Sequence, residues 1–205
     1  MLWGYHQPQF YKTGKQQDID RFLSLQSTIS NDLAELKNIA IQNNINIGQP
    51  VDRLIALGRQ TLIAGNALKQ LYYKKGFEDY GQEGEMRVYA HWIENYSSIP
   101  KSNILQLRRH EKDFMLRGRA EYAQLYFHTV DSMLRQLPEN KSRLELQSYK
   151  DSFSKLVRYT EELGINNNIG IAPALLLNIR QFDKQYALTD ATAIRKCMTC
   201  NYVSI

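Results

Sequence analysis

The sequence predicts an all-α protein made of six helices. Across most of its 205 residues, apolar side chains recur at alternating steps of three and four, the spacing of one face of an α-helix. No segment shows the strict apolar and polar alternation that is typical of a half-buried strand. Five prolines and eleven glycines are too few for a turn-rich β architecture.

The first two helices are expected at 18–43 and 51–75. The first carries an apolar seam with a nearly seven-residue period, formed by Ile19, Phe22, Ile29, Leu33, Leu36 and Ala40. The asparagine-rich run 43–50 interrupts this pattern, and Pro50 is well placed to begin the second helix.

The third and fourth helices are expected at 83–96 and 101–137. Pro100 suits the start of the fourth helix, and Pro138 stops it. At about 37 residues, a single helix over 101–137 would be on the order of 55 Å long. Gly118 is the weak point within it.

The last two helices follow Pro138. A seam on the fifth helix consists of Leu146, Tyr149, Phe153, Leu156, Thr160 and Leu163. The sixth helix is expected from about 172 to 196, with Pro173 acceptable in its first turn.

A faint internal repeat organises these helices. The glycine-punctuated loops 76–84 and 164–170 each join a helix to a shorter one, and each glycine is expected to cap a helix or adopt a positive φ. Hairpins over about 51–96 and 139–196 would then flank the long helix 101–137. Two four-helix bundles stacked end to end in an elongated molecule are one interpretation, and chance similarity of two helix pairs is the other.

The helical domain is predicted to cover 17–196, between an N-terminal segment, 1–16, and a tail, 197–205. The tail contains Cys197 and Cys200. A lone Cys-x-x-Cys pair lacks the further ligands of a metal site and the βα context of a redox motif, so its role stays open.

Composition narrows the function classes. A net charge of +5 and a hydrophobic content of 43% fit an ordinary folded domain. No Lys/Arg cluster is interleaved with aromatic residues, so no nucleic-acid partner is predicted. The longest apolar run, 169–179, is about half of the roughly twenty residues that a membrane span needs, and the N-terminus does not resemble a signal peptide.

A charged stretch lies inside the fourth helix. Glu111 falls on an apolar seam that also contains Ile104, Leu107, Phe114 and Gly118. A carboxylate there is costly unless it is paired, and Arg108 lies one turn earlier. Arg109 with Asp113, and Asp113 with Arg117, are further pairs at spacing four. We expect Arg108, Glu111 and Asp113 to form a structural ion-pair layer.

No enzyme, cofactor or metal is predicted. The chain has no Gly-x-Ser-x-Gly, no phosphate-cradling loop and no His-Glu-x-x-His. A di-iron bundle requires Glu-x-x-His pairs, whereas His91 and Glu94 occur once and in the reverse order.

Two motifs resemble a known family. Residues 107–117 are similar to the Arg-Arg-x-Glu-Lys-Asp-Phe-x-Leu-Arg segment of helical sensory domains in bacterial chemoreceptors and sensor histidine kinases. Residues 75–87, followed by His91 and Glu94, resemble a second motif of these domains, and Tyr122 also fits. The match is closest to the helical bimodular (HBM) type and covers about a quarter of the chain.

The resemblance implies a six-helix sensor domain of two stacked four-helix bundles. Such a domain is periplasmic, dimerises, senses small molecules that include organic acids, and is anchored through transmembrane helices that this chain lacks. Whether the receptor controls chemotaxis, a kinase or a cyclase stays open. Phe77 replaces the usual leucine, the first helix is short, and the Cys-x-x-Cys tail has no counterpart.

Arginine suits a carboxylate ligand because its guanidinium donates two parallel hydrogen bonds. The candidate ligand-binding residues are Arg53, Arg87, His91, Arg108, Arg109, Arg117, Tyr122 and Tyr126. Each also has an ordinary explanation in surface pairing or core packing. The alternative function is a non-catalytic protein-interaction module, which a filled core and an exposed apolar stripe would favour.

Overall fold

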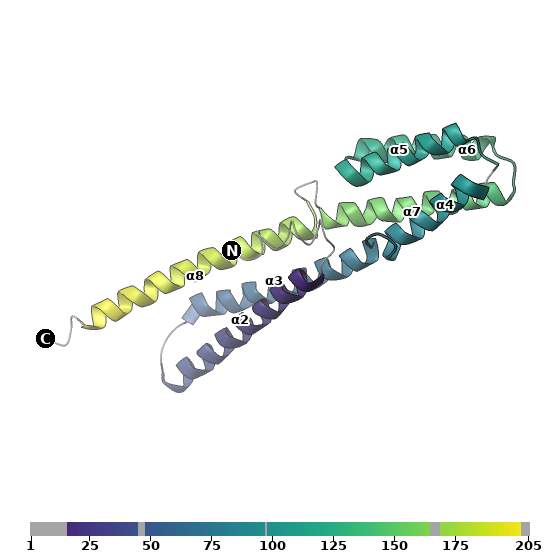
Figure 1. The fold of residues 1–205 in the computed structure, drawn as a ribbon. Coiled ribbons are helices and arrows are strands. Elements are labelled where there is room, and N and C mark those ends of the chain that lie inside the picture. The colour runs from purple at the N-terminus through teal and green to yellow at the C-terminus, as the bar shows by residue number, and fades with distance from the viewer. Residues whose placement is uncertain (1–15, 45–47, 97, 165–168, 202–205) are drawn as a thin grey trace. The chain divides into compact units, whose positions relative to one another are not determined.

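The computed structural model describes residues 16–44, 48–96, 98–164 and 169–201, with the backbone alone at 16–18, 48, 96 and 190–201. The described residues form helices and no strand (Figure 1), which confirms the all-α class. The seven helices within these ranges are α2 (Gln16–Gln42), α3 (Gly48–Lys75), α4 (Gly81–Tyr96), α5 (Lys101–Arg117), α6 (Ala120–Gln136), α7 (Lys141–Leu163) and α8 (Ile171–Asn201). None of them is both long and apolar enough to cross a bilayer.

The chain divides into two compact units. The middle unit is Leu68–Ala172, and the terminal unit combines Met1–Ala67 with Pro173–Ile205. Helices α3 and α8 contribute residues to both units. The expected hairpins 51–96 and 139–196 therefore straddle the division, and their pairing stays a prediction.

Four helices of the middle unit share one core. Helix α4 packs on α7, α5 on α6, α6 on α7, and α4 on α5. Aromatic rings fill the centre: the Phe153 ring lies 3.8 Å from that of Tyr126 and 5.4 Å from that of Phe114, measured between centroids. The predicted seam of α7 supplies the fully buried Leu146, Tyr149 and Phe153.

The single helix expected over 101–137 is wrong. Helix α5 ends at Gly118, whose φ of 61° is left-handed and whose amide donates to the Phe114 carbonyl at 2.7 Å. Arg119 is extended, and α6 begins at the next residue. Because glycine adopts this conformation without steric cost, the chain can reverse here. The reversal lets α5 and α6 pack side by side, so that both apolar faces are buried in one core (Figure 1).

The two glycine loops share a geometry. Gly76 and Gly81 have φ of 81° and 63°, and Gly164 and Gly170 have φ of 71° and 142°. A Cβ on Gly76 would lie 1.9 Å from the Tyr80 carbonyl oxygen, and one on Gly164 would lie 2.4 Å from that of Ile169. The expectation of a positive φ is confirmed at these four glycines and is wrong for Gly84, which lies within α4. In each loop the backbone returns close to the helix that it leaves.

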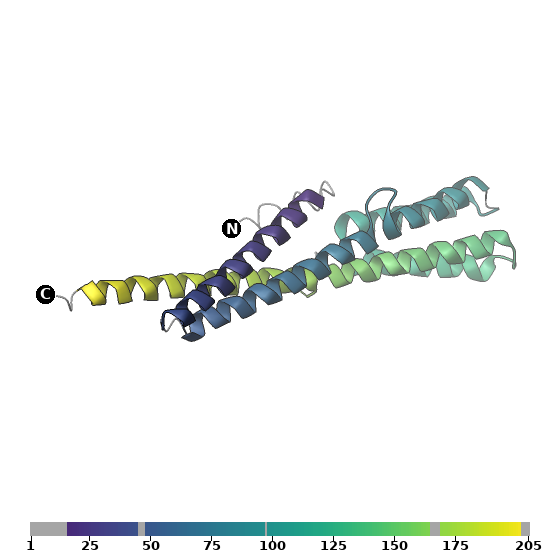
Figure 2. The ribbon, with the colours of Figure 1, turned by 90° about the horizontal axis from the view of Figure 1, so that it is seen from below.

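In the terminal unit, α2 packs closely on α3 (Figure 2). Gly58 and Gly65 are seven residues apart on one face of α3. A Cβ on Gly65 would meet Leu23 at 2.8 Å, and one on Gly58 would meet Ser30 at 3.1 Å. The absence of side chains at both glycines allows this close approach.

The end of α8 differs from the predicted boundary of the helical domain. Helix α8 runs to Asn201, so its end lies beyond the expected limit at 196 and inside the expected tail. The side chains of Cys197 and Cys200, and the N-terminal segment up to residue 15, lie outside the described residues.

Candidate functional site

A charged cluster lies within the core of the middle unit. It consists of Arg108, Glu111, Tyr149 and Glu94, and is called the Glu111 cluster below. Helix α5 places Glu111 on the same face as the buried Leu107 and Phe114, and its side chain is 0% exposed. The local sequence thus forces a carboxylate into the core, where it requires partners.

Each oxygen of Glu111 has hydrogen-bond donors. Arg108 Nη1 donates to Oε1 at 2.6 Å and to Oε2 at 2.5 Å. The Tyr149 hydroxyl donates to Oε2, and Lys112 Nζ lies 3.1 Å from Oε1. Arg108 Nε also reaches Glu94 Oε1 on α4 at 2.8 Å. The cluster therefore ties α5 to both α4 and α7.

The surroundings shift the pKa values of Arg108 and Tyr149. Burial alone would lower the pKa of Arg108. The contacts with Tyr149 and with the negatively charged Glu111 raise this pKa by more than burial lowers it, so the net shift is upward. Burial raises the pKa of Tyr149 well above 10, and the charge on Glu111 adds to this rise. Arg108 thus stays charged and Tyr149 stays a donor, as an ion-paired structural layer requires.

Asp113 does not join the Glu111 cluster. It lies 3.9 Å from Arg109 Nε and 3.5 Å from Arg117 Nη2, at the spacing of four that the sequence shows. These pairs are partly exposed and contribute little to stability. The expected layer therefore contains Arg108 and Glu111 without Asp113.

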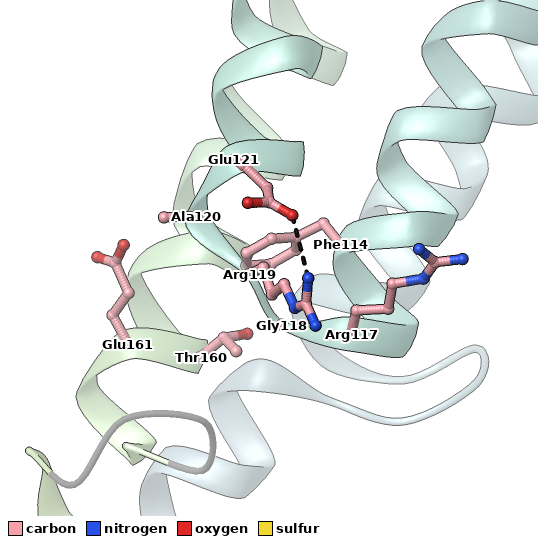
Figure 3. Close-up of a pocket in the computed structure, with 8 residues that line it drawn as sticks. All are labelled: Phe114, Arg117, Gly118, Arg119, Ala120, Glu121, Thr160 and Glu161. Carbon is pink, nitrogen blue, oxygen red and sulfur yellow. Dashed lines mark hydrogen bonds and ion pairs between the residues drawn. The ribbon is translucent and has the colours of Figure 1, made fainter.

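A cavity of about 470 Å³ opens at the turn between α5 and α6 (Figure 3). We call it the turn cavity. Residues of the turn form one wall, and the C-terminal part of α7 forms the other. The lining residues are Phe114, Arg117, Gly118, Arg119, Ala120, Glu121, Thr160 and Glu161.

The turn cavity carries charges of both signs. Arg119 lies beside Phe114 and pairs loosely with Glu121, at 3.5 Å (Figure 3). Arg117 lies at the edge, where it donates to the Tyr122 hydroxyl at 2.6 Å. Glu161, on α7, forms no ion pair with any residue that the structure describes.

The structure brings few of the sequence candidates together. Arg117 lines the turn cavity, and its guanidinium donates a hydrogen bond to the Tyr122 hydroxyl. Arg108 belongs to the Glu111 cluster, and the Tyr126 ring packs edge-on against that of Tyr149, at 5.6 Å between centroids. Tyr126 is fully buried, which leaves it no access to a ligand in the turn cavity.

The other four candidates lie elsewhere. Arg87 pairs with Asp79 at 3.2 Å, and His91 contacts the side chain of Asn95 at 3.1 Å. The Arg109 side chain is 82% exposed. Arg53 belongs to the terminal unit and is exposed. No single site collects all eight residues.

Four cavity residues were not predicted as site residues from the sequence: Arg119, Glu121, Thr160 and Glu161. Arg119 and Glu121 face the cavity because the chain reverses at Gly118, where a continuous helix was expected. Thr160 and Glu161 come from another helix and meet the turn only in the folded chain. If the chain reversal at Gly118 had been predicted, Arg119 and Glu121 would have been recognised as residues of the turn.

Comparison with known protein families, curated proteins and solved structures found no match to this chain. Among the described residues, no group of three or more His, Cys, Asp or Glu side chains is arranged to hold a metal ion.

Proposed function

We propose that this chain is the extracytoplasmic ligand-binding domain of a transmembrane signalling receptor, of the HBM type that its motifs resemble. In this proposal the helices form two stacked four-helix bundles, and further segments of a longer receptor anchor the domain in the membrane. The ligand is a small solute that carries a carboxylate, such as an organic acid.

The observation that carries the proposal is Arg119 in the lining of the turn cavity. Arg119 is loosely paired and largely exposed, so a ligand carboxylate can replace Glu121 as its partner. Arg117 is held by Tyr122 and Asp113, and its guanidinium points away from the other lining residues, so Arg119 is the arginine that would bind the ligand (Figure 3). The cavity volume of about 470 Å³ lies within the usual range for small-molecule sites.

The position of the cavity also suits signalling. Helix α5 carries the Glu111 cluster in its middle and Arg117 at its end. A ligand that bridges the turn and α7 would favour one relative position of these helices. Binding changes the output only if the two helix arrangements differ in affinity for the ligand.

Thermal denaturation with di- and tricarboxylates tests the proposal. A ligand that binds only the folded state stabilises it by about 2.7 kcal/mol at a hundred times its Kd. We expect at least one acid to raise the melting temperature, and Arg119→Ala to remove the effect. Arg135→Ala, an exposed change in the last turn of α6, is the matched control. If no acid raises the melting temperature of the unaltered chain, direct sensing of acids is wrong.

One observation favours the interaction module as a second candidate. Leu105 and Leu116 lie eleven residues apart on one face of α5 and are 67% and 82% exposed. Exposed leucines on one helix face suit a protein partner, and a second copy of this chain is the simplest one. Sedimentation equilibrium should then detect a weak homodimer that Leu116→Glu dissociates. A monomer at all concentrations, with and without a carboxylate, would exclude this homodimer.

A further inference from the structure

We propose that the turn cavity takes a zwitterion, and specifically a free α-amino acid, in preference to a simple carboxylic acid. The inference rests on the proposed function, because it assumes that the ligand binds in this cavity. It names the chemical class of that ligand from the charges that line the cavity.

The cavity lining carries charges of both signs. Arg119 supplies a positive charge, and Glu121 and Glu161 supply negative ones, whereas the Arg117 guanidinium points away from the other lining residues (Figure 3). A dicarboxylate would gain Arg119, but both glutamates would repel it. A ligand with one charge of each sign avoids this repulsion and contacts both kinds of side chain.

Arg119 is the group that would bind the ligand carboxylate. It lines the cavity, and its one ion pair among the described residues is the loose contact of 3.5 Å with Glu121 (Figure 3). A carboxylate bound to Arg119 would lie close to Glu121. The ammonium of the same molecule would offset the repulsion between the ligand carboxylate and Glu121, whereas a second carboxylate would add to it.

The α7 wall provides acceptors for the ammonium. Glu161 has no ion-pair partner among the described residues. The Thr160 hydroxyl donates to the Leu156 carbonyl at 2.8 Å, so its lone pairs remain available as acceptors. An ammonium donates three hydrogen bonds and accepts none, which matches this wall. Phe114 adds an apolar surface for a side chain.

Calorimetric titration of the full chain tests the inference. The probes are the twenty L-α-amino acids, each paired with the acid that lacks only the amino group, such as L-aspartate with succinate. We expect at least one amino acid to bind about tenfold or more tightly than its partner, since a hydrogen bond to a charged group contributes about 1.5–3 kcal/mol. N-acetylation of that amino acid should cause a similar loss.

A pair of adjacent variants assigns the ammonium to α7. Glu161→Gln should weaken the amino acid about tenfold and leave the deaminated acid unchanged or bound more tightly. Glu162→Gln is the matched control, because Glu162 pairs with Arg158 at 3.7 Å and does not line the cavity. The circular dichroism spectra of both variants should match that of the unaltered chain.

The outcomes separate the two proposals. Equal or tighter binding of the deaminated acids would overturn the zwitterion and leave the carboxylate sensor standing. Binding of neither class would overturn both. Amino-acid binding that Glu161→Gln does not weaken would overturn the assignment of the ammonium to this wall.

Discussion

At the scale of single residues, Glu111 shows how a core can hold a charge. Its carboxylate is fully buried, and donors from Arg108, Lys112 and Tyr149 surround it. Removal of one member of such a set leaves buried polar atoms without one of their partners, which costs more than the pair itself contributes. We therefore expect the Glu111 cluster to fix the register of α5 more than it adds to stability.

We expect Glu111→Ala to destabilise the chain by about 3 kcal/mol, because it removes the acceptor of both Arg108 Nη1 and the Tyr149 hydroxyl and leaves Arg108 with Glu94 as its remaining ion pair. Urea denaturation followed by circular dichroism measures the change. Glu162→Ala, which removes one exposed partner of Arg158, should stay within about 0.5 kcal/mol. A change of the same small size for Glu111→Ala would contradict the burial of the charge.

Two buried tyrosines should respond in opposite directions to the loss of their hydroxyls. The Tyr126 hydroxyl is buried without a hydrogen bond to any described residue, whereas that of Tyr149 donates to Glu111. Tyr126→Phe should be neutral or stabilising by about 1 kcal/mol, and Tyr149→Phe should destabilise by about 1–3 kcal/mol. The reverse order in equilibrium unfolding would show that the Tyr126 hydroxyl has a partner.

The same tyrosines predict a loss of stability in alkali. Burial raises the pKa of both groups well above 10, and the charge on Glu111 adds to the rise. Both stay protonated in the folded chain, whereas they ionise near pH 10 in the unfolded chain. Their contribution is complete below pH 10 and falls as the pH rises above it. Absorbance near 295 nm should show two tyrosines that titrate only on unfolding, and titration of all tyrosines near pH 10 without unfolding would contradict this.

At the scale of elements, the turn at Gly118 decides the fold of the middle unit. Alanine at a left-handed position costs about 1–2 kcal/mol, and asparagine tolerates this conformation better. We expect Gly118→Ala to lower stability by that amount and Gly118→Asn to lower it less. Gly76→Ala should cost more than either, because its Cβ would also lie 1.9 Å from a backbone oxygen. Equal effects of alanine and asparagine at 118 would argue against the left-handed cap.

The sequence was a good guide to the faces of helices and a poor guide to the break between them. The seam of α7 was predicted because periodicity records which side chains are buried, and Tyr149 and Phe153 are buried. The break at Gly118 was not predicted, because helical spacing continues on both sides and one glycine costs a helix only about 1 kcal/mol. The chain reverses because packing α5 on α6 lowers the free energy of the folded state. That contribution comes from contacts between two helices, which the local sequence does not show.

At the scale of the molecule, the turn cavity depends on contacts distant in sequence. Arg117 and Tyr122 were found from the sequence because arginine suits a carboxylate and Tyr122 fits the motifs of the sensory family. Thr160 and Glu161 lie about forty residues further along the chain and reach the cavity through the packing of α7. A site assembled from two helices in this way cannot be read from the spacing of residues.

Amide resonances of the isotopically labelled chain give the most direct test of ligand binding at the turn cavity. The chain would be titrated with succinate and, separately, with L-aspartate. We expect saturable shifts concentrated at residues 114–121 and 160–161 with at least one of the two, and loss of these shifts in Arg119→Ala. Shifts confined to the terminal unit, or no saturable shift with either compound, would contradict a ligand site at this turn.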